Sequence, residues 1–303
     1  MIDFLDGIAL TSDRLYRETE FLIPDFLPKR MITMYYADGG NAKTWLSYGV
    51  AAYICQHNLA KRVYYIDLDN PLDTLKDRGV SELLMNRFAT FKYIHRSDLE
   101  ESPIELLERL ASKDNSRHHA YEDMVLIIDS WRNVTNIKND EKAMYMMNLL
   151  MDIREAGMTV VGIAHSNKDG KNYEGSNNIK NSLDVMFKQT LLKSRMGEYV
   201  VVNLEPKKER SGVRACDWKI NTNTLEMTKA DAVISRMDSQ ETEFVNNVKA
   251  LLAKHPKGLN KTDVLEGIGT RKDNKTAINL LKKFEGEFYK MEQDGKKHIY
   301  SLL

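Results

Sequence analysis

A lysine–threonine pair follows a glycine-containing loop in the stretch YYADGGNAKTWL, residues 35–46. A loop of the form G-x-x-x-x-G-K-S/T, placed between a strand and a helix, cradles the phosphates of a nucleotide. In such a loop the lysine reaches the β- and γ-phosphates, and the hydroxyl group ligates Mg²⁺. Lys43 and Thr44 are the candidates for these two roles. The stretch therefore predicts a site for ATP and Mg²⁺.

The loop departs from the standard pattern at both glycine positions, which hold Ala37 and Ala42, while Gly39 and Gly40 fall inside it. Glycine suits these positions because backbone N–H groups must point at phosphate oxygens with no side chain in the way. We expect the methyl group of Ala42 to lie close to the phosphates. A glycine-rich turn beside a solvated lysine is the alternative. The residues expected around the nucleotide are Ala37, Asp38, Gly39, Gly40, Asn41, Ala42, Lys43, Thr44 and Trp45.

Three more candidates follow apolar runs: Asp69 in YYIDLDNP, Asp129 in MVLIIDSW and His165 in GIAHSN. A carboxylate at the carboxyl end of a parallel strand beside a phosphate loop holds Mg²⁺ and its waters, and Asp129 fits this role. Asp69, or Asp67 in its place, would orient or deprotonate the attacking water. The imidazole of His165 would sense the γ-phosphate. Polar strand ends, an acidic turn and a structural histidine are the alternatives.

The elements that must position these residues are five short apolar runs. Most of them are continuous rather than alternating, which indicates strands buried on both faces of a parallel sheet. Helical patterns lie between them at 43–58, 102–113 and 141–157. Repeated strand–helix order predicts an α/β core with right-handed crossovers. The predicted strands are 31–36, 62–69, 91–95, 124–129 and 159–165.

The pattern changes after about residue 185. The runs at 198–207 and 214–229 indicate antiparallel strands added at a sheet edge, and residues 229–241 are polar and suit a linker. Three helical patterns then precede two strand-like runs separated by Asp294-Gly295, a strong hairpin signal. This is the order of a winged helix. We therefore expect an ATPase domain over 1–228, a linker over 229–241 and a winged-helix domain over 242–303.

Composition limits the class of protein. The 303 residues carry 44 basic and 44 acidic side chains, so any nucleic-acid surface must be local. Two cysteines make neither a disulfide framework nor a metal cluster, and they suit a reducing compartment. The first residues do not form a signal peptide, and no run approaches the length of a membrane helix. We expect a cytoplasmic protein without a membrane partner.

Taken together, the motifs resemble the RecA-like P-loop ATPases, in the branch of the hexameric replicative helicases of the RepA and DnaB types. The phrase LIPDFLPKR before the phosphate loop is similar to the entry of that branch. The segment AHSNKDGKNYEGSNNIKNSLDVMF is similar to its sensor strand and mobile loop, and KKERSG (207–212) to its K-x-R finger. The resemblance covers about residues 20–225.

The resemblance implies roles for individual residues. Lys43 and Thr44 match the phosphate and Mg²⁺ ligands, and Asp129 matches the acid of the second nucleotide motif. Asp69 falls where the family has its catalytic glutamate, and His165 falls at the sensor position. Lys208 and Arg210 match the finger that enters a neighbouring subunit's nucleotide site. A solvated charge run at a hairpin tip is the alternative for KKERSG.

Two departures argue against full activity. They are Ala42 for glycine and Asp69 for the longer glutamate. A shorter side chain displaces the base by about an ångström, and misplacement on that scale costs on the order of a hundredfold in rate.

The family's DNA contacts come from loops after the third and fourth core strands, here 131–142 and 166–180. Tyr173 in the second loop offers a ring for base stacking. The tail 241–303 carries 12 basic and 9 acidic residues, so its third helix suits either DNA or another replication protein. The basic candidates for DNA are Arg132, Lys168, Lys171, Lys180, Lys275, Lys282 and Lys283.

The sequence thus predicts an ATP-hydrolysing, helicase-like replication protein that forms a ring, expected to be a hexamer, on single-stranded DNA. A nucleotide-gated DNA-binding assembly or regulatory protein with little ATPase activity is the alternative. A scaffold that has lost nucleotide binding is a third option.

Overall fold

The computed structural model describes residues 6, 9, 10, 12, 18–167, 170, 172–294 and 297–303. The chain divides into two units, Met1–Ala230 and Asp231–Leu303. Each unit has a hydrophobic core of its own among its described residues.

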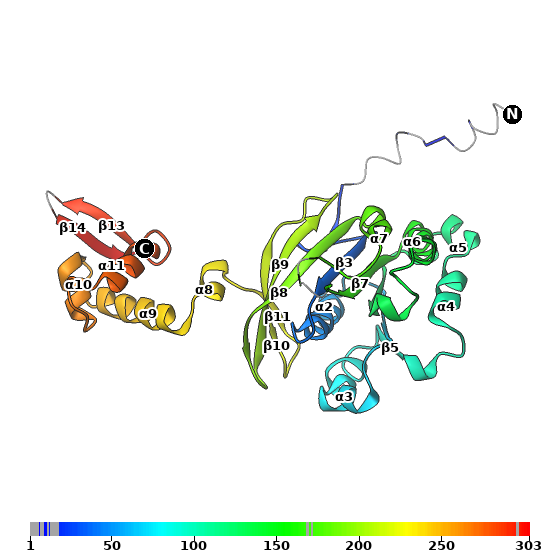
Figure 1. Cartoon of the computed structure of the whole chain (residues 1–303), viewed down its shortest axis with the longest axis horizontal. Coiled ribbons are helices and arrows are strands. Elements are labelled where there is room, and N and C mark those ends of the chain that lie inside the picture. Colours follow the sequence, from blue (N-terminus) through cyan, green and yellow to red (C-terminus); the bar gives the residue numbers. More distant parts are fainter. Residues whose placement is uncertain are drawn as a thin grey trace. The chain divides into compact units, whose positions relative to one another are not determined.

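The first unit is built around one large sheet (Figure 1). Its strands are β3 (Ile32–Ala37), β4 (Arg62–Asp67), β5 (Phe91–His95), β6 (Met124–Asp129), β7 (Thr159–His165), β8 (Val185–Arg195), β9 (Tyr199–Lys208), β10 (Cys216–Asn221) and β11 (Met227–Lys229). Within the described residues their order is β11-β10-β9-β8-β3-β7-β6-β4-β5. From β8 to β5 every pairing is parallel, so these strands end at one edge of the sheet.

The predicted α/β core with a mainly parallel sheet is confirmed. All five predicted strands form, as β3, β4, β5, β6 and β7. The three predicted helices form as α2 (Lys43–Gln56), α4 (Pro103–Leu110) and α6 (Asp140–Glu155). A capping box of Ser102 and Glu105 fixes the start of α4, and the Asn139 side chain caps α6.

The antiparallel edge also forms, but β8 was missed by the strand predictions. β9, β10 and β11 continue the sheet in antiparallel pairs, as predicted from residues 198–229. β8 lies between this edge and β3. Its sequence VMFKQTLLKSR mixes buried apolar with polar residues. This mixture hides the strand from a search for continuous apolar runs.

The two faces of the sheet carry separate apolar clusters. Leu46 and Ile54 of α2 pack with Tyr35 on one face. Met146 and Leu150 of α6 pack with the alternate β3 residues on the other face, in a second cluster. Because side chains alternate along a strand, β3 feeds both clusters and must be apolar throughout.

Shorter elements complete the first unit. The strands β1 (Phe21–Ile23) and β2 (Leu27–Pro28) form a separate antiparallel pair. Among the described residues of this unit, the remaining helices are α3 (Leu72–Asp77), the π-helix η2 (Ser81–Met85), the 3₁₀ helices η3 (Arg96–Asp98) and η4 (Trp131–Asn133), α5 (Lys113–Arg117) and α7 (Asn177–Ser182).

The second unit contains helices followed by a hairpin. Its elements are α8 (Ala232–Arg236), α9 (Ser239–Ala253), β12 (Leu259–Asn260), α10 (Lys261–Gly267), α11 (Lys275–Lys283), β13 (Tyr289–Asp294) and β14 (Lys297–Leu302). The three strands pair in the order β12-β14-β13. Residues 229–241, predicted as a linker, contain α8 and the first turn of α9. Asp231 caps α8, and a capping box of Asp238 and Glu241 starts α9.

Across the part of the chain that is described, no helix combines the length and the apolar character needed to cross a membrane.

Gly162 lets the strand β7 pass directly over the fully buried ring of Trp131, two residues after Asp129. A Cβ atom at position 162 would lie 1.9 Å from Cε2 of Trp131. We expect Gly162→Ala to lower the free energy of unfolding by about 1–3 kcal/mol, because a packed core resists added volume. Chemical denaturation of the purified chain measures this loss.

Gly39→Ala is the matched control. A Cβ atom at position 39 meets nothing within 4 Å, and Gly39 is not among the positive-φ glycines. Equal stability of the two variants would contradict the packing argument.

Candidate nucleotide-binding site

The phosphate loop lies where β3 ends at Ala37 and α2 begins at Lys43. Gly40 has φ of 78°, and Ala42 has φ of 59° and ψ of 26°, so both adopt the left-handed conformation. Cβ atoms built at Gly39 and Gly40 meet nothing within 4 Å, so there is open space beside both residues. The first turn of a helix leaves N–H groups without intrahelical partners, and such groups at the start of α2 suit an anion.

Ala42 therefore adopts the left-handed backbone conformation that a glycine would adopt at this position. A left-handed conformation costs a residue with a Cβ atom about 1–2 kcal/mol. From the sequence we expected the methyl group of Ala42 to crowd the phosphates, and Ala42 does line the pocket. The structure adds a second problem, because the backbone of Ala42 is in a conformation that favours glycine.

The amine of Lys43 points back at its own loop. Nζ donates to the carbonyl oxygens of Ala37 at 2.9 Å and Asp38 at 2.8 Å. Burial lowers the pKa of Lys43, while the carboxylates of Asp129, Asp38 and Asp69 act in the opposite direction. A partly desolvated cation held by carbonyl oxygens gains from an anionic partner. Lys43 thus suits phosphate oxygens.

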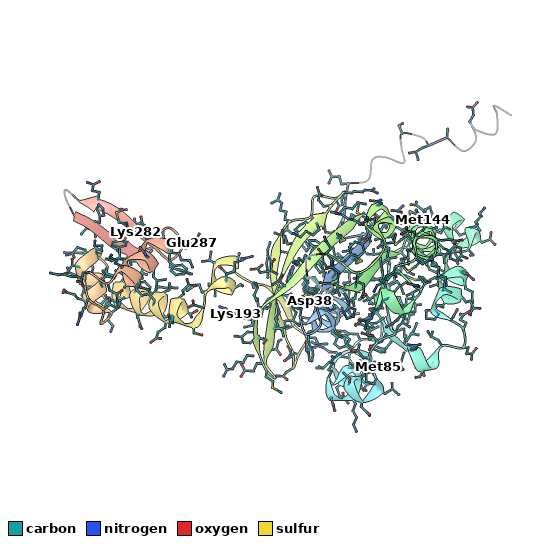
Figure 2. All side chains as sticks on the ribbon, viewed as in Figure 1. Asp38, Met85, Met144, Lys193, Lys282 and Glu287 are labelled. Carbon is teal, nitrogen blue, oxygen red and sulfur yellow. The ribbon has the colours of Figure 1, made fainter. Side chains whose placement is uncertain are left out.

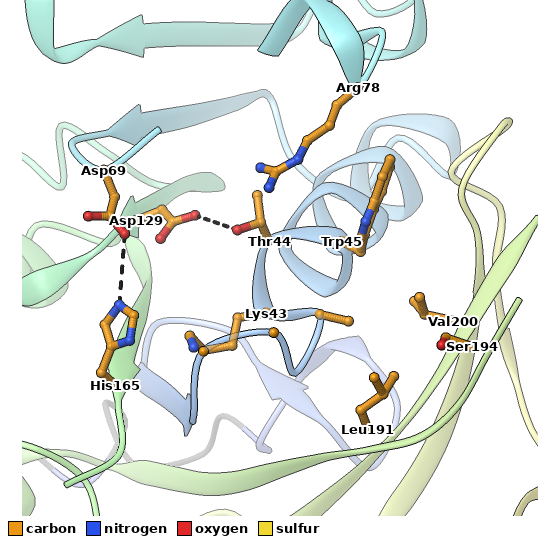
Figure 3. Close-up of a pocket in the computed structure, with 13 residues that line it drawn as sticks. Lys43, Thr44, Trp45, Asp69, Arg78, Asp129, His165, Leu191, Ser194 and Val200 are labelled. Atoms are coloured by element: carbon orange, nitrogen blue, oxygen red, sulfur yellow. Dashed lines mark hydrogen bonds and ion pairs between the residues drawn. The ribbon is translucent and has the colours of Figure 1, made fainter. Parts of the chain in front are cut away.

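Asp129 and Thr44 form the candidate metal site (Figure 3). Thr44 Oγ1 donates to Asp129 Oδ2 at 3.2 Å, and the hydroxyl of Tyr65 donates to the same oxygen at 3.0 Å. Burial raises the pKa of Asp129 to about 6, and the neighbouring Asp67 carboxylate acts in the same direction. A buried carboxylate beside another favours a cation, and Mg²⁺ takes one or two carboxylates plus phosphate oxygens. The residues present fit Mg²⁺.

Asp67 cannot replace Asp69 as the water-activating base in this structure, contrary to one expectation from the sequence. It is fully buried, and its oxygens accept hydrogen bonds from Asn70 and from the hydroxyl of Tyr93, the latter at 2.5 Å. Its Oδ1 also accepts from the backbone N–H of Asp69 at 2.9 Å. Asp67 therefore shapes the turn that presents Asp69.

Asp69 lies at the mouth of the site and is held by several neighbours. His165 Nε2 lies 3.8 Å from Asp69 Oδ2, and Asn133 Nδ2 donates to Oδ1 at 3.0 Å. Arg132 forms an ion pair with Oδ1 at 3.2 Å. The contact with His165, followed by those with Asn133 and Arg132, holds the pKa of Asp69 well below its usual range. A carboxylate with a lowered pKa orients water better than it removes a proton.

These residues line one cavity of about 350 Å³. Gly39, Gly40, Lys43, Thr44, Asp69, Asp129 and His165 come together there as predicted. The opposite side of the cavity is formed by Trp45 of α2 and by the β8–β9 hairpin (Figure 3). That hairpin contributes Leu191, Ser194 and Val200.

Sequence reasoning missed Arg78 and the three hairpin residues. Arg78 follows α3 and lines the cavity, where its Nη1 donates to Asn70 at 3.0 Å. The residues around it, LKDRGV, carry no signal that separates a site arginine from a solvated one. Leu191 and Ser194 were missed because β8 itself was missed. Val200 lies on the predicted strand β9, but nothing in its apolar run marked it as a site residue.

Lys208 and Arg210 do not line the cavity of their own chain. Lys208 Nζ donates to the carbonyl oxygens of Lys180 and Asn181, both at 2.7 Å, at the end of α7. Arg210 lies 3.6 Å from the carboxylate of Asp184, and 55% of its side chain is exposed. Arg210 is therefore the more exposed of the two side chains.

The predicted DNA-contacting residues are scattered. Arg132 is exposed and pairs with Asp69 at the edge of the cavity, and Lys180 is exposed on α7. Lys168 and Lys171 lie outside the described residues. Tyr173 is not available for base stacking here, because it is buried against Tyr36.

In the second unit, Lys275 and Lys282 are exposed on α11, and Figure 2 labels Lys282. Lys283 pairs with Glu241 of α9 at 2.5 Å.

A family model for an AAA domain matches residues 11–171, more than half of the chain. The chain belongs to the AAA domain family. The match includes the phosphate loop, Asp69, Asp129 and His165, and it ends before Lys208 and Arg210. The phosphate loop follows β3, the central strand of a mainly parallel sheet, so this AAA domain protein has the predicted α/β P-loop core.

Two solved structures are similar at low identity. The flagellar accessory protein FlaH from Methanocaldococcus jannaschii is 12% identical, with a TM-score of 0.47 over 68% of this chain and 92% of that one. The RadB recombinase is 14% identical, with a TM-score of 0.46 over 68% of this chain and 93% of that one. A search of curated proteins found no match.

Asp129→Asn tests the buried carboxylate. The folded pKa of about 6 lies above the ordinary 3.8, so this group's contribution to stability falls as the pH rises from about 4 to about 6. The full effect is on the order of 3 kcal/mol. We expect nucleotide-free Asp129→Asn to unfold at a higher temperature than wild type at pH 7.5, with a smaller difference at pH 4.5. Thermal unfolding at the two pH values measures this.

The exposed Asp77 of α3 provides the control Asp77→Asn. The same pH-dependent gain in that variant would contradict the assignment to Asp129.

Proposed function

We propose that this AAA domain protein binds and hydrolyses Mg-ATP, and that it acts on DNA as a ring-forming, helicase-like or translocase-like replication protein. One observation supports the nucleotide chemistry most directly. Lys43, Thr44 and the buried Asp129 meet in one cavity at the carboxyl ends of parallel strands. This is where open α/β sheets bind their ligands.

The residues divide the work on the triphosphate. Lys43 exchanges the loop carbonyls for β- and γ-phosphate oxygens, and Thr44 with Asp129 holds the metal ion. When bound, Mg²⁺ would neutralise negative charge on the phosphates. Asp69 orients the attacking water. His165, at the end of β7 and 3.8 Å from Asp69, senses the γ-phosphate and passes its state to the following loop.

We include a ring in the proposal because phosphoryl transfer needs a positioned cation that neutralises charge in the transition state. Lys208 and Arg210 lie outside their own cavity, so a finger role for them requires a neighbouring subunit. A head-to-tail ring supplies one, and we propose six subunits. Of the two, Arg210 is the main candidate, since its guanidinium is largely exposed.

DNA is the proposed partner. Arg132 and Lys180 are exposed, and with Lys168 and Lys171 they provide cations for the phosphates of a single strand. Arg132 also contacts Asp69, so DNA binding to Arg132 would free the carboxylate.

For the second unit we propose a winged helix. α9, α10 and α11 are followed by the β13–β14 hairpin, which is the order of that fold. Lys275 and Lys282 would meet DNA from α11, or the unit would dock on another replication protein. We place the protein in the cytoplasm, where its two buried cysteines stay reduced.

A nucleotide-gated DNA-binding assembly protein with little ATPase activity is the second candidate. The contacts of Asp69 favour it, because its carboxylate is held by Arg132, Asn133 and His165 and is a weak base. The strained Ala42 also favours it. In this candidate, nucleotide binding assembles the ring and hydrolysis is rare.

Mixing two inactive variants tests the finger in trans. Lys43→Ala abolishes Mg-ATP binding, and Arg210→Ala lowers hydrolysis by roughly 10³–10⁵-fold, because it leaves the transition-state charge without its cation. In a random equal mixture, roughly a quarter of the interfaces pair an intact loop with an intact finger. We expect hydrolysis to recover at these interfaces. Steady-state phosphate release with single-stranded DNA measures it.

Arg214→Ala is the matched control for loss of an exposed arginine. A mixture that shows only the summed activities of its two variants would contradict a shared active site.

The rate of hydrolysis separates the two candidates. For a motor, Asp69→Asn should lower turnover by about 10²–10⁴-fold while binding of an ATP analogue remains, because only the positioning of water is lost. The exposed Asp73→Asn is its control. Wild-type turnover no faster than that of Lys43→Ala would select the assembly protein. Absence of a thermal shift with Mg²⁺ and the analogue would exclude both.

A further inference from the structure

Asn41 ties the phosphate loop to the neighbouring strand β8. The Nε2 atom of Gln189 donates to the backbone carbonyl of Asn41 at 2.5 Å. The backbone N–H of Leu191 donates to the side-chain Oδ1 of Asn41 at 3.2 Å. Two hydrogen bonds of different kinds therefore hold one loop residue against one strand.

These two hydrogen bonds can influence the backbone of the phosphate loop because of where Asn41 lies in it. It lies between two residues in the left-handed conformation, Gly40 with φ of 78° and Ala42 with φ of 59°. Gly40 adopts this conformation freely because it has no Cβ atom. Ala42 does not, so an unanchored loop would move toward backbone angles that an alanine prefers.

Gln189 is a rigid anchor. Only 2% of it is exposed, and β8 is paired with β3 on one side and with β9 on the other. Among the described residues, the Oε1 atom of the same amide has no hydrogen-bond partner. The carbonyl of Asn41 can only accept, so the amide must present Nε2 to the loop. The buried amide of Gln189 thus donates its hydrogen bond to the phosphate loop.

We propose that Gln189 and Asn41 form a positioning clamp that holds Ala42 in the left-handed conformation. The clamp keeps the loop amides aimed at the phosphates, so it replaces the glycine that such loops have at position 42. It rests on the proposed nucleotide binding and explains how that binding tolerates the alanine. Because Leu191 and Ser194 of β8 line the far side of the cavity, the clamp also joins the phosphate end of the site to that side.

The clamp acts on the fraction of molecules whose loop is ready to bind. Apparent affinity falls in proportion to that fraction. Loss of the clamp should therefore weaken nucleotide binding where position 42 is alanine. With glycine at position 42, the left-handed conformation needs no support, and loss of the clamp should have little effect.

The experiment is a double-mutant cycle in the full chain. Gln189→Met keeps the volume of the side chain and removes its donor, and Asn41→Ala removes the acceptor for Leu191. Each is made with Ala42 and with Ala42→Gly. The dissociation constant of a fluorescent ATP analogue with Mg²⁺ is measured by titration. We expect each clamp variant to bind about fivefold more weakly than wild type, as for one lost hydrogen bond. With Ala42→Gly the loss should be less than about twofold.

Thr190→Ala is the matched control, because Thr190 is the next residue of β8 and is exposed. It should leave binding unchanged in both backgrounds. Thermal unfolding of every variant, without nucleotide, reports any general loss of stability. Such a loss would be the same whether position 42 is alanine or glycine.

Three outcomes would count against the clamp. Equal weakening in both backgrounds would mean that the contact is structural only, and unchanged binding in the alanine background would mean that the loop needs no anchor. Absence of binding in every variant, wild type included, would overturn the proposed nucleotide function and the clamp with it. Binding by wild type without coupling would overturn the clamp alone.

Discussion

The buried carboxylate of Asp129 is the constraint on which the site depends. Parallel strands end at one edge of the sheet, so Asp67 at the end of β4 and Asp129 at the end of β6 lie beside each other in a desolvated place. Two carboxylates there favour a cation. The hydroxyls of Thr44 and Tyr65 supply hydrogen bonds, and the amine of Lys43 lies nearby, held by the loop carbonyls. This charge arrangement gains from a metal ion and a polyanion together.

Binding and turnover place different demands on this arrangement. The groups for binding are buried and fixed by the core, since Asp129 ends a strand and Lys43 begins a helix. Asp69 lies on the turn after β4 and is shared among Arg132, Asn133 and His165. The role in hydrolysis that we propose for Asp69 therefore depends on these three neighbours, which another ligand could displace. In the proposed function, DNA would regulate turnover at this carboxylate.

The loop itself shows how a departure from a motif is tolerated. A glycine at position 42 would adopt the left-handed conformation without support from other parts of the chain. With alanine there, the turn relies on Asn41 and on Gln189, a residue nearly 150 positions away in the sequence. The conformation of the phosphate loop thus depends on its contacts with the strand β8. In such an arrangement, a movement of the β8–β9 hairpin would change the position of the loop amides that we expect to bind phosphate.

The sequence by itself determined the strands β3 to β7 and the helices α2, α4 and α6, and it pointed to Lys43, Thr44 and Asp129 as neighbours in one site. These follow from continuous apolar runs and from local spacing, which the chain carries without reference to its folded state. Only the tertiary structure revealed β8, Arg78, the enclosed Asp67 and Tyr173, and the anchor at Gln189. Each depends on which segments become neighbours in the sheet, and polar residues in a mixed strand carry no local pattern that predicts such neighbours. The left-handed backbone of Ala42 was also revealed only by the tertiary structure. Alanine does not favour this conformation, and contacts with residues far away in the sequence hold it there.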